Sequence, residues 1–184
     1  MDKKKIELIK ENNHIWTVND VNEGKFLLKK VSEFAYADYS KKDIDLFVKH
    51  MRKMMVSAHG IGLSANQIGL PYRLFVAQLP SKDGKGYVGK FYAIINPVIT
   101  FASAKKIADQ EGCLSIPYTY GIVDRAEKIT IEGLDKNGRM VTLKVEGLLA
   151  RIFQHETDHL HGILFTSKAR DVFKVEPPQT EVQP

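Results

Sequence analysis

The segment Gln154–His159 reads Gln-His-Glu-Thr-Asp-His and carries the chemistry that the sequence shows most clearly. On an α-helix, side chains four residues apart lie on one face, so His155 and His159 would present two imidazoles to one transition metal. Glu156 beside them is placed to act as a general base, an arrangement typical of metal-dependent hydrolases. The spacing therefore predicts a helix that carries a catalytic metal.

A catalytic metal site of this kind needs a third protein ligand and leaves a fourth position for water. Downstream the candidates are poor, because His161 points to another side of the helix and Glu176 lies in a proline-rich stretch. Upstream, Cys113 is the single cysteine of the chain, and its thiolate would complete a set of two imidazoles and one sulfur. Such a set suits zinc, iron, nickel or cobalt.

Two helices are expected to position these residues. Ser40 is a good N-cap for a first helix, which Gly60 would stop. That helix carries one apolar stripe, made of Ile44, Phe47, Val48, Met51, Met54 and Met55. The second runs from Gly147 to about His161 and ends at Gly162. Its inward face would consist of Leu148, Leu149, Ile152, His155, Glu156 and His159.

Strands are expected at 73–79, 91–95 and 98–102, with Asn96-Pro97 breaking the chain between the last two. Ranges 128–134 and 140–145 are extended as well, and Asn137-Gly138 between them is typical of a hairpin turn. The first 40 residues have weak periodicity and are expected to form loops and short extended pieces. Together these patterns predict an α+β fold, with antiparallel or mixed β-sheets packed around the metal-bearing helix.

Length and composition fit a single catalytic domain over residues 1–174, followed by a polar tail at 175–184 that we expect to be disordered. The net charge is +5, but the basic residues are scattered, so no dedicated nucleic-acid surface is expected. One cysteine excludes an intramolecular disulfide and favours a reducing compartment. No apolar run is long enough to span a membrane. We therefore expect a cytoplasmic monomer.

Three stretches together resemble the three motifs of the peptide deformylases: residues 60–67 (GIGLSANQ), 111–115 (EGCLS) and 154–160 (QHETDHL). They occur in the order of that family, and the similarity extends over roughly residues 44–166. The resemblance implies a metallohydrolase that removes the N-formyl group from the initiator methionine of new polypeptides and releases formate. It also implies Fe²⁺ as the metal in the cell, with Zn²⁺, Ni²⁺ or Co²⁺ in the isolated protein.

By motif position, the resemblance makes Cys113, His155 and His159 the metal ligands, with water as the fourth. Glu156 would take a proton from that water and pass it to the leaving amine. Gln67, through its side-chain amide, and Leu114, through its backbone N–H, would stabilise the oxyanion.

The resemblance also places the substrate. Its chain would pair with the backbone of residues 61–63 as a short added strand. The residues expected to contact it are Ile61, Gly62, Leu63, Gly112, Leu148, Arg151 and Ile152. Arg125 and Asp158 would pair and hold the metal-bearing helix against the sheet.

Two positions depart from the family pattern. Ser64 stands where alanine is usual, and we expect this small change to be tolerated. Arg151 lies one turn before His155, where the family usually has an apolar residue beside the methionine pocket. One hypothesis is that its guanidinium extends to the rim of the cleft while its stem lines the pocket. The other is that its charge narrows the pocket or contacts an anionic group of the substrate.

Two other functions are compatible with a His-Glu-x-x-His helix. A peptide-cleaving metalloprotease would use a downstream ligand and would not need Cys113. A metal-stabilised binding module of the translation machinery would have four protein ligands, and the sequence offers no obvious fourth. The long basic C-terminal helix that docks some bacterial deformylases on the ribosome is also not evident. We therefore expect proximity to the ribosome without that contact.

Overall fold

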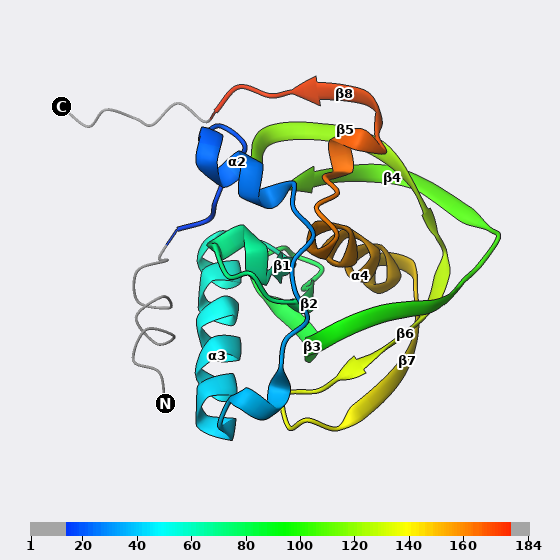
Figure 1. The fold of residues 1–184 in the computed structure, drawn as a ribbon. Helices are drawn as coiled ribbons and strands as arrows, with labels where there is room; N and C mark the ends of the chain where they lie inside the picture. The colour runs from blue at the N-terminus through cyan, green and yellow to red at the C-terminus, as the bar shows by residue number, and fades with distance from the viewer. Residues whose placement is uncertain (1–13, 178–184) are drawn as a thin grey trace.

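The computed structural model describes residues 14–177, in which two antiparallel sheets surround one helix (Figure 1). That helix, α4 (Gly147–Leu160), carries His155 and His159. The larger sheet has the strand order β1-β2-β3-β6-β7, and the smaller has the order β4-β5-β8. The predicted α+β class is confirmed. Within the described residues, none of the helices has the length and apolar character needed to cross a membrane. The expected tail lies largely outside this range.

Helix α3 (Lys41–Ser57) forms where the apolar stripe predicted it. The Ser40 hydroxyl accepts the N–H of Asp43, whose carboxylate accepts the N–H of Ser40 in return, so a capping box starts the helix. Its apolar stripe packs in one core with residues of β1 (Gly62–Ser64) and β2 (Leu74–Pro80). Helix α3 thus supports the edge of the larger sheet.

The end of α3 differs from the prediction. His59 takes the left-handed backbone conformation there (φ 54°), and the Gly60 N–H closes the turn on the carbonyl of Met55 (2.9 Å). Gly60 also leaves room for a neighbour, because a Cβ at this position would lie 2.7 Å from the side chain of Leu114. The glycine therefore permits close approach of the segment that follows Cys113.

The β6–β7 hairpin, Lys128–Leu134 and Met140–Glu146, confirms the predicted turn, with Gly138 at φ 76°. The break expected at Asn96-Pro97 is instead an irregularity inside one strand, β3 (Tyr87–Ala102). Asn96 adopts φ 51°, and its side-chain amide forms two hydrogen bonds with the backbone of Phe34. A long-range contact therefore holds the chain where proline chemistry alone predicted an interruption.

Several elements were not predicted. Strands β4 (Lys106–Cys113), β5 (Ile116–Ala126) and β8 (Arg170–Lys174) form the smaller sheet. The 3₁₀ helices η1, η2 and η3 span Tyr36–Asp38, Ala65–Ile68 and Phe165–Ser167. Helix α2 (Val21–Leu27) contradicts the expectation of loops and extended pieces in the first 40 residues. Asp20 caps this helix by accepting two backbone N–H groups, a local signal that the short apolar runs obscured.

Helix α4 is fixed to both sheets. Phe153 is fully buried and packs on Phe75 of β2, with their ring centroids 5.2 Å apart. The side chain of Gln154 exchanges hydrogen bonds of 2.9 and 3.0 Å with the backbone of Ala126 in β5. Gly162 follows the helix at φ 72°, which confirms the predicted stop. The inward face was wrong at Leu148, which is 44% exposed.

Candidate metal centre and active site

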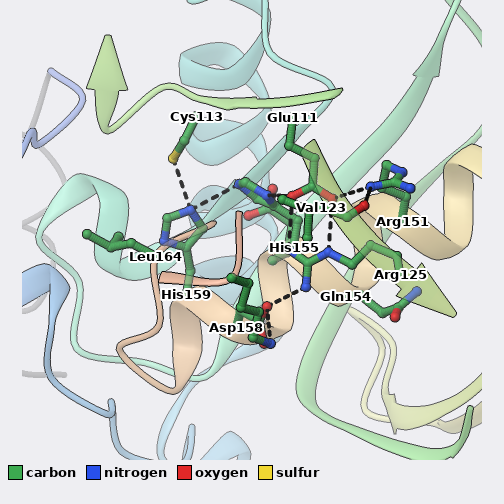
Figure 2. Close-up of polar contacts among 12 residues, drawn as sticks. Glu111, Cys113, Val123, Arg125, Arg151, Gln154, His155, Asp158, His159 and Leu164 are labelled. Atoms are coloured by element: carbon green, nitrogen blue, oxygen red, sulfur yellow. Dashed lines mark hydrogen bonds and ion pairs between the residues drawn. The ribbon is translucent and has the colours of Figure 1, made fainter. Parts of the chain in front are cut away.

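The last residue of β4 and two residues of α4 bring three donor atoms together (Figure 2). Sγ of Cys113 lies 3.1 Å from Nε2 of His159, which lies 3.2 Å from Nε2 of His155. All three atoms lie within 4.8 Å of one another. Donors that share one ion at about 2.0–2.3 Å have separations of this size. The donor set and its geometry therefore fit a single transition metal.

Glu111 orients one of the two imidazoles. Its Oε2 lies 2.9 Å from Nδ1 of His155, which leaves Nε2 of that ring directed to the cluster (Figure 2). Glu111 stands two residues before Cys113 in β4, so both side chains leave the strand on the same side. This spacing was present in the sequence, but it became informative only with the strand assigned.

The cluster has strongly shifted proton affinities. Burial alone would raise the pKa of the Cys113 thiol, but the imidazoles of His159 and His155 lower it to about 5. Burial would lower the pKa of His155, whereas the Cys113 thiolate and Glu111 raise it to about 10. Sulfur is thus held as a thiolate, the form that binds metals. A divalent cation would take the place of the proton that these groups otherwise share.

Glu156 lies on the neighbouring side of α4 and is 4% exposed. Its Oε2 accepts a hydrogen bond of 2.7 Å from the Ser64 hydroxyl, a contact that sequence reasoning missed. Burial raises the pKa of this carboxyl, which the nearby imidazoles partly offset. A carboxyl tuned upward in this way suits proton transfer near neutral pH.

The side-chain amide of Gln67 has a fixed orientation. Its Oε1 accepts the Ser64 N–H (2.9 Å), so Nε2 is directed to Ser115 Oγ (3.1 Å) and to Cys113 Sγ (3.6 Å). Leu114 follows Cys113 in the turn between β4 and β5. Two groups that can donate hydrogen bonds, from η2 and from this turn, therefore lie beside the metal-binding atoms.

A cleft of about 580 Å³ opens over the cluster. Its walls include most of the residues expected from the sequence to take part in catalysis or to contact the substrate: Ile61, Gly62, Gln67, Gly112, Leu114, Leu148, Arg151, Ile152 and Glu156. Leu63 does not belong to the walls. It is fully buried and packs in the core beneath α3, because successive side chains of β1 face opposite sides. Because the Ser64 N–H turns away from β2, the alternation of antiparallel pairing directs the backbone polar groups of Leu63 toward β2 and away from the cleft.

The hypothesis that the guanidinium of Arg151 extends to the rim of the cleft is wrong. The residue is 7% exposed, and its guanidinium turns inward to Oε1 of Glu111 (2.7 Å) (Figure 2). It also donates to the carbonyls of Val123 (3.0 Å) and Ile107 (2.6 Å). The buried carboxylate supplies a partner that a solvent-exposed position would not, and the positive charge is already matched.

Arg151→Ile should therefore lower the free energy of unfolding, by about 2–4 kcal/mol, because buried acceptors lose their donor. The ranking of formyl-methionyl peptides that differ in their second residue should stay the same. Urea unfolding and kcat/KM over a peptide set measure the two effects. Leu148→Ala, in the exposed cleft wall, is the stability control and should change the unfolding free energy by at most about 0.5 kcal/mol. An altered ranking at unchanged stability would instead assign Arg151 to substrate selection.

Arg125 lies behind the metal-binding atoms and contacts two carboxylates. It donates to both oxygens of Glu111 at 2.9 Å and forms an ion pair with Asp158 (Figure 2). Lys168 completes the surroundings of Asp158, with Nζ at 2.6 and 2.7 Å from its oxygens. These contacts join β4, β5 and α4. His161 bonds to the carbonyl of Thr157 and stands outside the cluster, as its position on the helix predicted.

A family model described as polypeptide deformylase matches residues 14–174. The chain belongs to the polypeptide deformylase family. Members of this family are metal-dependent hydrolases that remove the N-formyl group from formyl-methionyl peptides, and the chain is an enzyme of this class. The resemblance inferred from three short motifs is thus confirmed over most of the sequence.

Relatives support the family assignment at the level of sequence and of structure. The peptide deformylase of Pelotomaculum thermopropionicum is 41% identical over 138 residues, which cover 75% of this chain and 83% of that relative. The peptide deformylase of Synechococcus elongatus in complex with actinonin has a TM-score of 0.73 and 33% identity, over 85% of this chain and 78% of that one. A Met-Ala-Ser-bound deformylase from Acinetobacter baumannii has a TM-score of 0.76 and 27% identity, over 84% and 96%.

Proposed function

We propose that Cys113, His155 and His159 hold the catalytic metal of this deformylase and that Glu156 is its general base. The observation that carries this proposal is the placement of the three donor atoms, within 4.8 Å of one another, in a cleft that Glu156 also lines. Neither alternative function accounts for Cys113 together with a site of three protein ligands. The same thiolate and imidazoles could bind several divalent metals. We propose Fe²⁺ in the cell and Zn²⁺, Ni²⁺ or Co²⁺ in isolated protein.

The reaction adds water across the formyl C–N bond. A metal held by Cys113, His155 and His159 would supply Lewis acidity and would lower the pKa of water at the site. Glu156 accepts a proton from the attacking water and delivers it to the departing amine nitrogen. The bond that forms joins the water oxygen to the formyl carbon, and the bond that breaks joins that carbon to nitrogen. Formate and a free methionyl amino group result.

The developing negative charge on the formyl oxygen needs hydrogen-bond donors already in place. Nε2 of Gln67 is directed toward the metal-binding atoms because Oε1 of the same amide accepts the Ser64 N–H. The backbone N–H of Leu114 is the second donor. The two groups come from different walls of the cleft, so a formyl group between them is bound from both sides.

The peptide part of the substrate pairs with β1. This strand lies at the edge of the larger sheet, and β2 occupies only one of its sides. Leu63 pairs with Val76 while the Ser64 N–H turns away from β2 to Gln67. By the alternation of antiparallel pairing, the polar backbone groups of Gly62 also face away from β2. An extended peptide can add there, with Gly112 opposite.

In this proposal the methionine side chain of the substrate lies against the helical wall of the cleft. Ile152 and the stem of Arg151 supply apolar surface there, and Leu148 stands at its exposed end. The Met-Ala-Ser complex of the Acinetobacter relative supports a peptide of this kind as the ligand.

We also propose the cellular setting. The substrate of the enzyme, a new polypeptide with a formylated N-terminus, would place the enzyme in the cytoplasm and close to the ribosome. We expect a monomer with a single catalytic domain, supported by the match over residues 14–174, and without a dedicated nucleic-acid surface. Arg125 and Asp158 would act as the clamp between the sheet and the metal-bearing helix.

One experiment tests the central proposal. Anaerobically purified protein is assayed for formate release from formyl-Met-Ala, and the metal content of the same sample is measured. We expect turnover that scales with metal, disappears after chelation, and returns with Fe²⁺. Met-Ala without the formyl group should remain intact. Cleavage of its peptide bond would indicate a protease, and metal-replete protein without any turnover would indicate a binding module.

A further inference from the structure

One face of the short strand β1 is directed at the proposed general base. Gly62 and Ser64 are two residues apart in this strand, so both lie on the same side, toward α4. Leu63 between them faces the opposite core. Ser64 is fully buried and contacts α4 with its side chain. Gly62 has no side chain, which leaves room for that of Glu156.

The Ser64 hydroxyl has two acceptors, both on Glu156. Oγ lies 2.7 Å from Oε2 of the carboxylate and 2.9 Å from the backbone carbonyl of the same residue. A hydroxyl has one proton, and a charged oxygen at the shorter distance is the stronger acceptor. Ser64 thus holds the Glu156 carboxylate against β1.

The second carboxylate oxygen has a different neighbour. A Cβ added to Gly62 would lie 2.3 Å from Oε1 of Glu156, which is closer than any real contact. Glycine at position 62 thus leaves room for the carboxylate in this orientation, beside the cleft that Gly62 and Glu156 both line. With Oε2 bound to Ser64 and Oε1 beside Gly62, the plane of the carboxylate is determined.

The same serine also holds the oxyanion-binding amide. Its N–H donates to Oε1 of Gln67 at 2.9 Å, whereas its hydroxyl donates to Glu156. We propose that Ser64 is a positioning residue that sets the Glu156 carboxylate relative to the Gln67 amide, by its side chain and its backbone respectively. This inference rests on the proposed role of Glu156 as the base. It replaces the expectation that a serine at this position is merely tolerated.

Because the two contacts use different groups, one substitution separates them. Ser64→Ala keeps the bond from the residue 64 N–H to the Gln67 side chain and removes the hydroxyl, which holds Glu156 and also accepts the Gln67 N–H in the capping box of η2. We expect kcat for formyl-Met-Ala to fall about tenfold, with unchanged KM and metal content and a thermal midpoint that falls by only a few degrees, since one buried hydrogen bond to a charged group is lost and proton transfer depends on placement.

A double-mutant cycle identifies the path of the effect. In a Glu156→Gln background, Ser64→Ala should change the residual rate by less than about twofold, because no proton acceptor remains to be positioned. Thr157→Val is the matched control. It removes a different buried hydroxyl, on the turn of α4 that carries Glu156. This hydroxyl has no hydrogen-bond partner within residues 14–177. It should leave kcat unchanged in both backgrounds.

The outcomes separate the two proposals. If Ser64→Ala lowers the rate equally in both backgrounds, or changes only the thermal midpoint and KM, then the serine has a packing role and the inference is overturned. If kcat does not fall, it is overturned as well. If Glu156→Gln alone retains full turnover, the assignment of the general base fails first.

Discussion

Glu156→Gln should lower kcat for formyl-Met-Ala by about 10²–10⁴-fold while one metal remains bound per chain. The amide has the shape of the carboxylate but cannot accept a proton from water. Its oxygen can still take the Ser64 hydroxyl, so the fold around β1 and α4 should persist. Formate release gives the rate, and elemental analysis of the same sample gives the metal content.

The control for Glu156→Gln is Glu33→Gln, which neutralises an exposed carboxylate. It should leave the rate and the metal content unchanged. Loss of metal from the Glu156 variant would mean that this carboxylate supports the ligands, and retained turnover would mean that another group moves the proton.

Glu111→Gln should have the largest effect on stability, a loss of about 3–5 kcal/mol in the free energy of unfolding. The Glu111 carboxylate, which is only 5% exposed, faces the guanidinium groups of Arg125 and Arg151. An amide leaves Arg151 without its buried carboxylate and Arg125 with Asp158 alone. Metal affinity should fall about 10–100-fold as well, since the Nδ1 contact of His155 is weakened. Urea unfolding and chelator competition measure the two quantities.

A surface pair provides the comparison for Glu111→Gln. Glu146 pairs with Lys128 at 2.9 Å, but both side chains are more than half exposed. Glu146→Gln should therefore change the unfolding free energy by less than about 1 kcal/mol and leave metal affinity as it is. If Glu111→Gln behaved like this surface variant, the buried network would not be what orients His155.

The parts of the fold that the sequence predicted are those determined by nearby residues. The capped helix α3, the β6–β7 hairpin and the glycine at the end of α4 all depend on contacts within a few positions. Strand β4 escaped detection because its side chains are largely exposed and polar, so no apolar alternation marks it. Its pairing with β5 is visible only in the folded structure.

The candidate site divides in the same way. Residue types and helical spacing singled out the two histidines and Glu156 as candidates, and Cys113 was added as the single thiol of the chain. The orientation of Arg151 was not predictable, because its carboxylate partner lies 40 positions away and the helix pattern says nothing about it. Ser64 and Glu156 are 92 positions apart, so a serine that looked neutral in its own motif gained a role only through the packing of β1 on α4.

The central position of α4 has a consequence for biogenesis. In chain order this helix follows β1 to β7, yet it lies between the sheets that those strands form (Figure 1). A core that closes around a late segment depends on contacts between distant parts of the sequence, which slows folding. Cys113 is made well before the two histidines, so a full set of donors exists only once α4 has docked. Cation uptake by a newly made chain should thus follow the docking of α4 between the sheets.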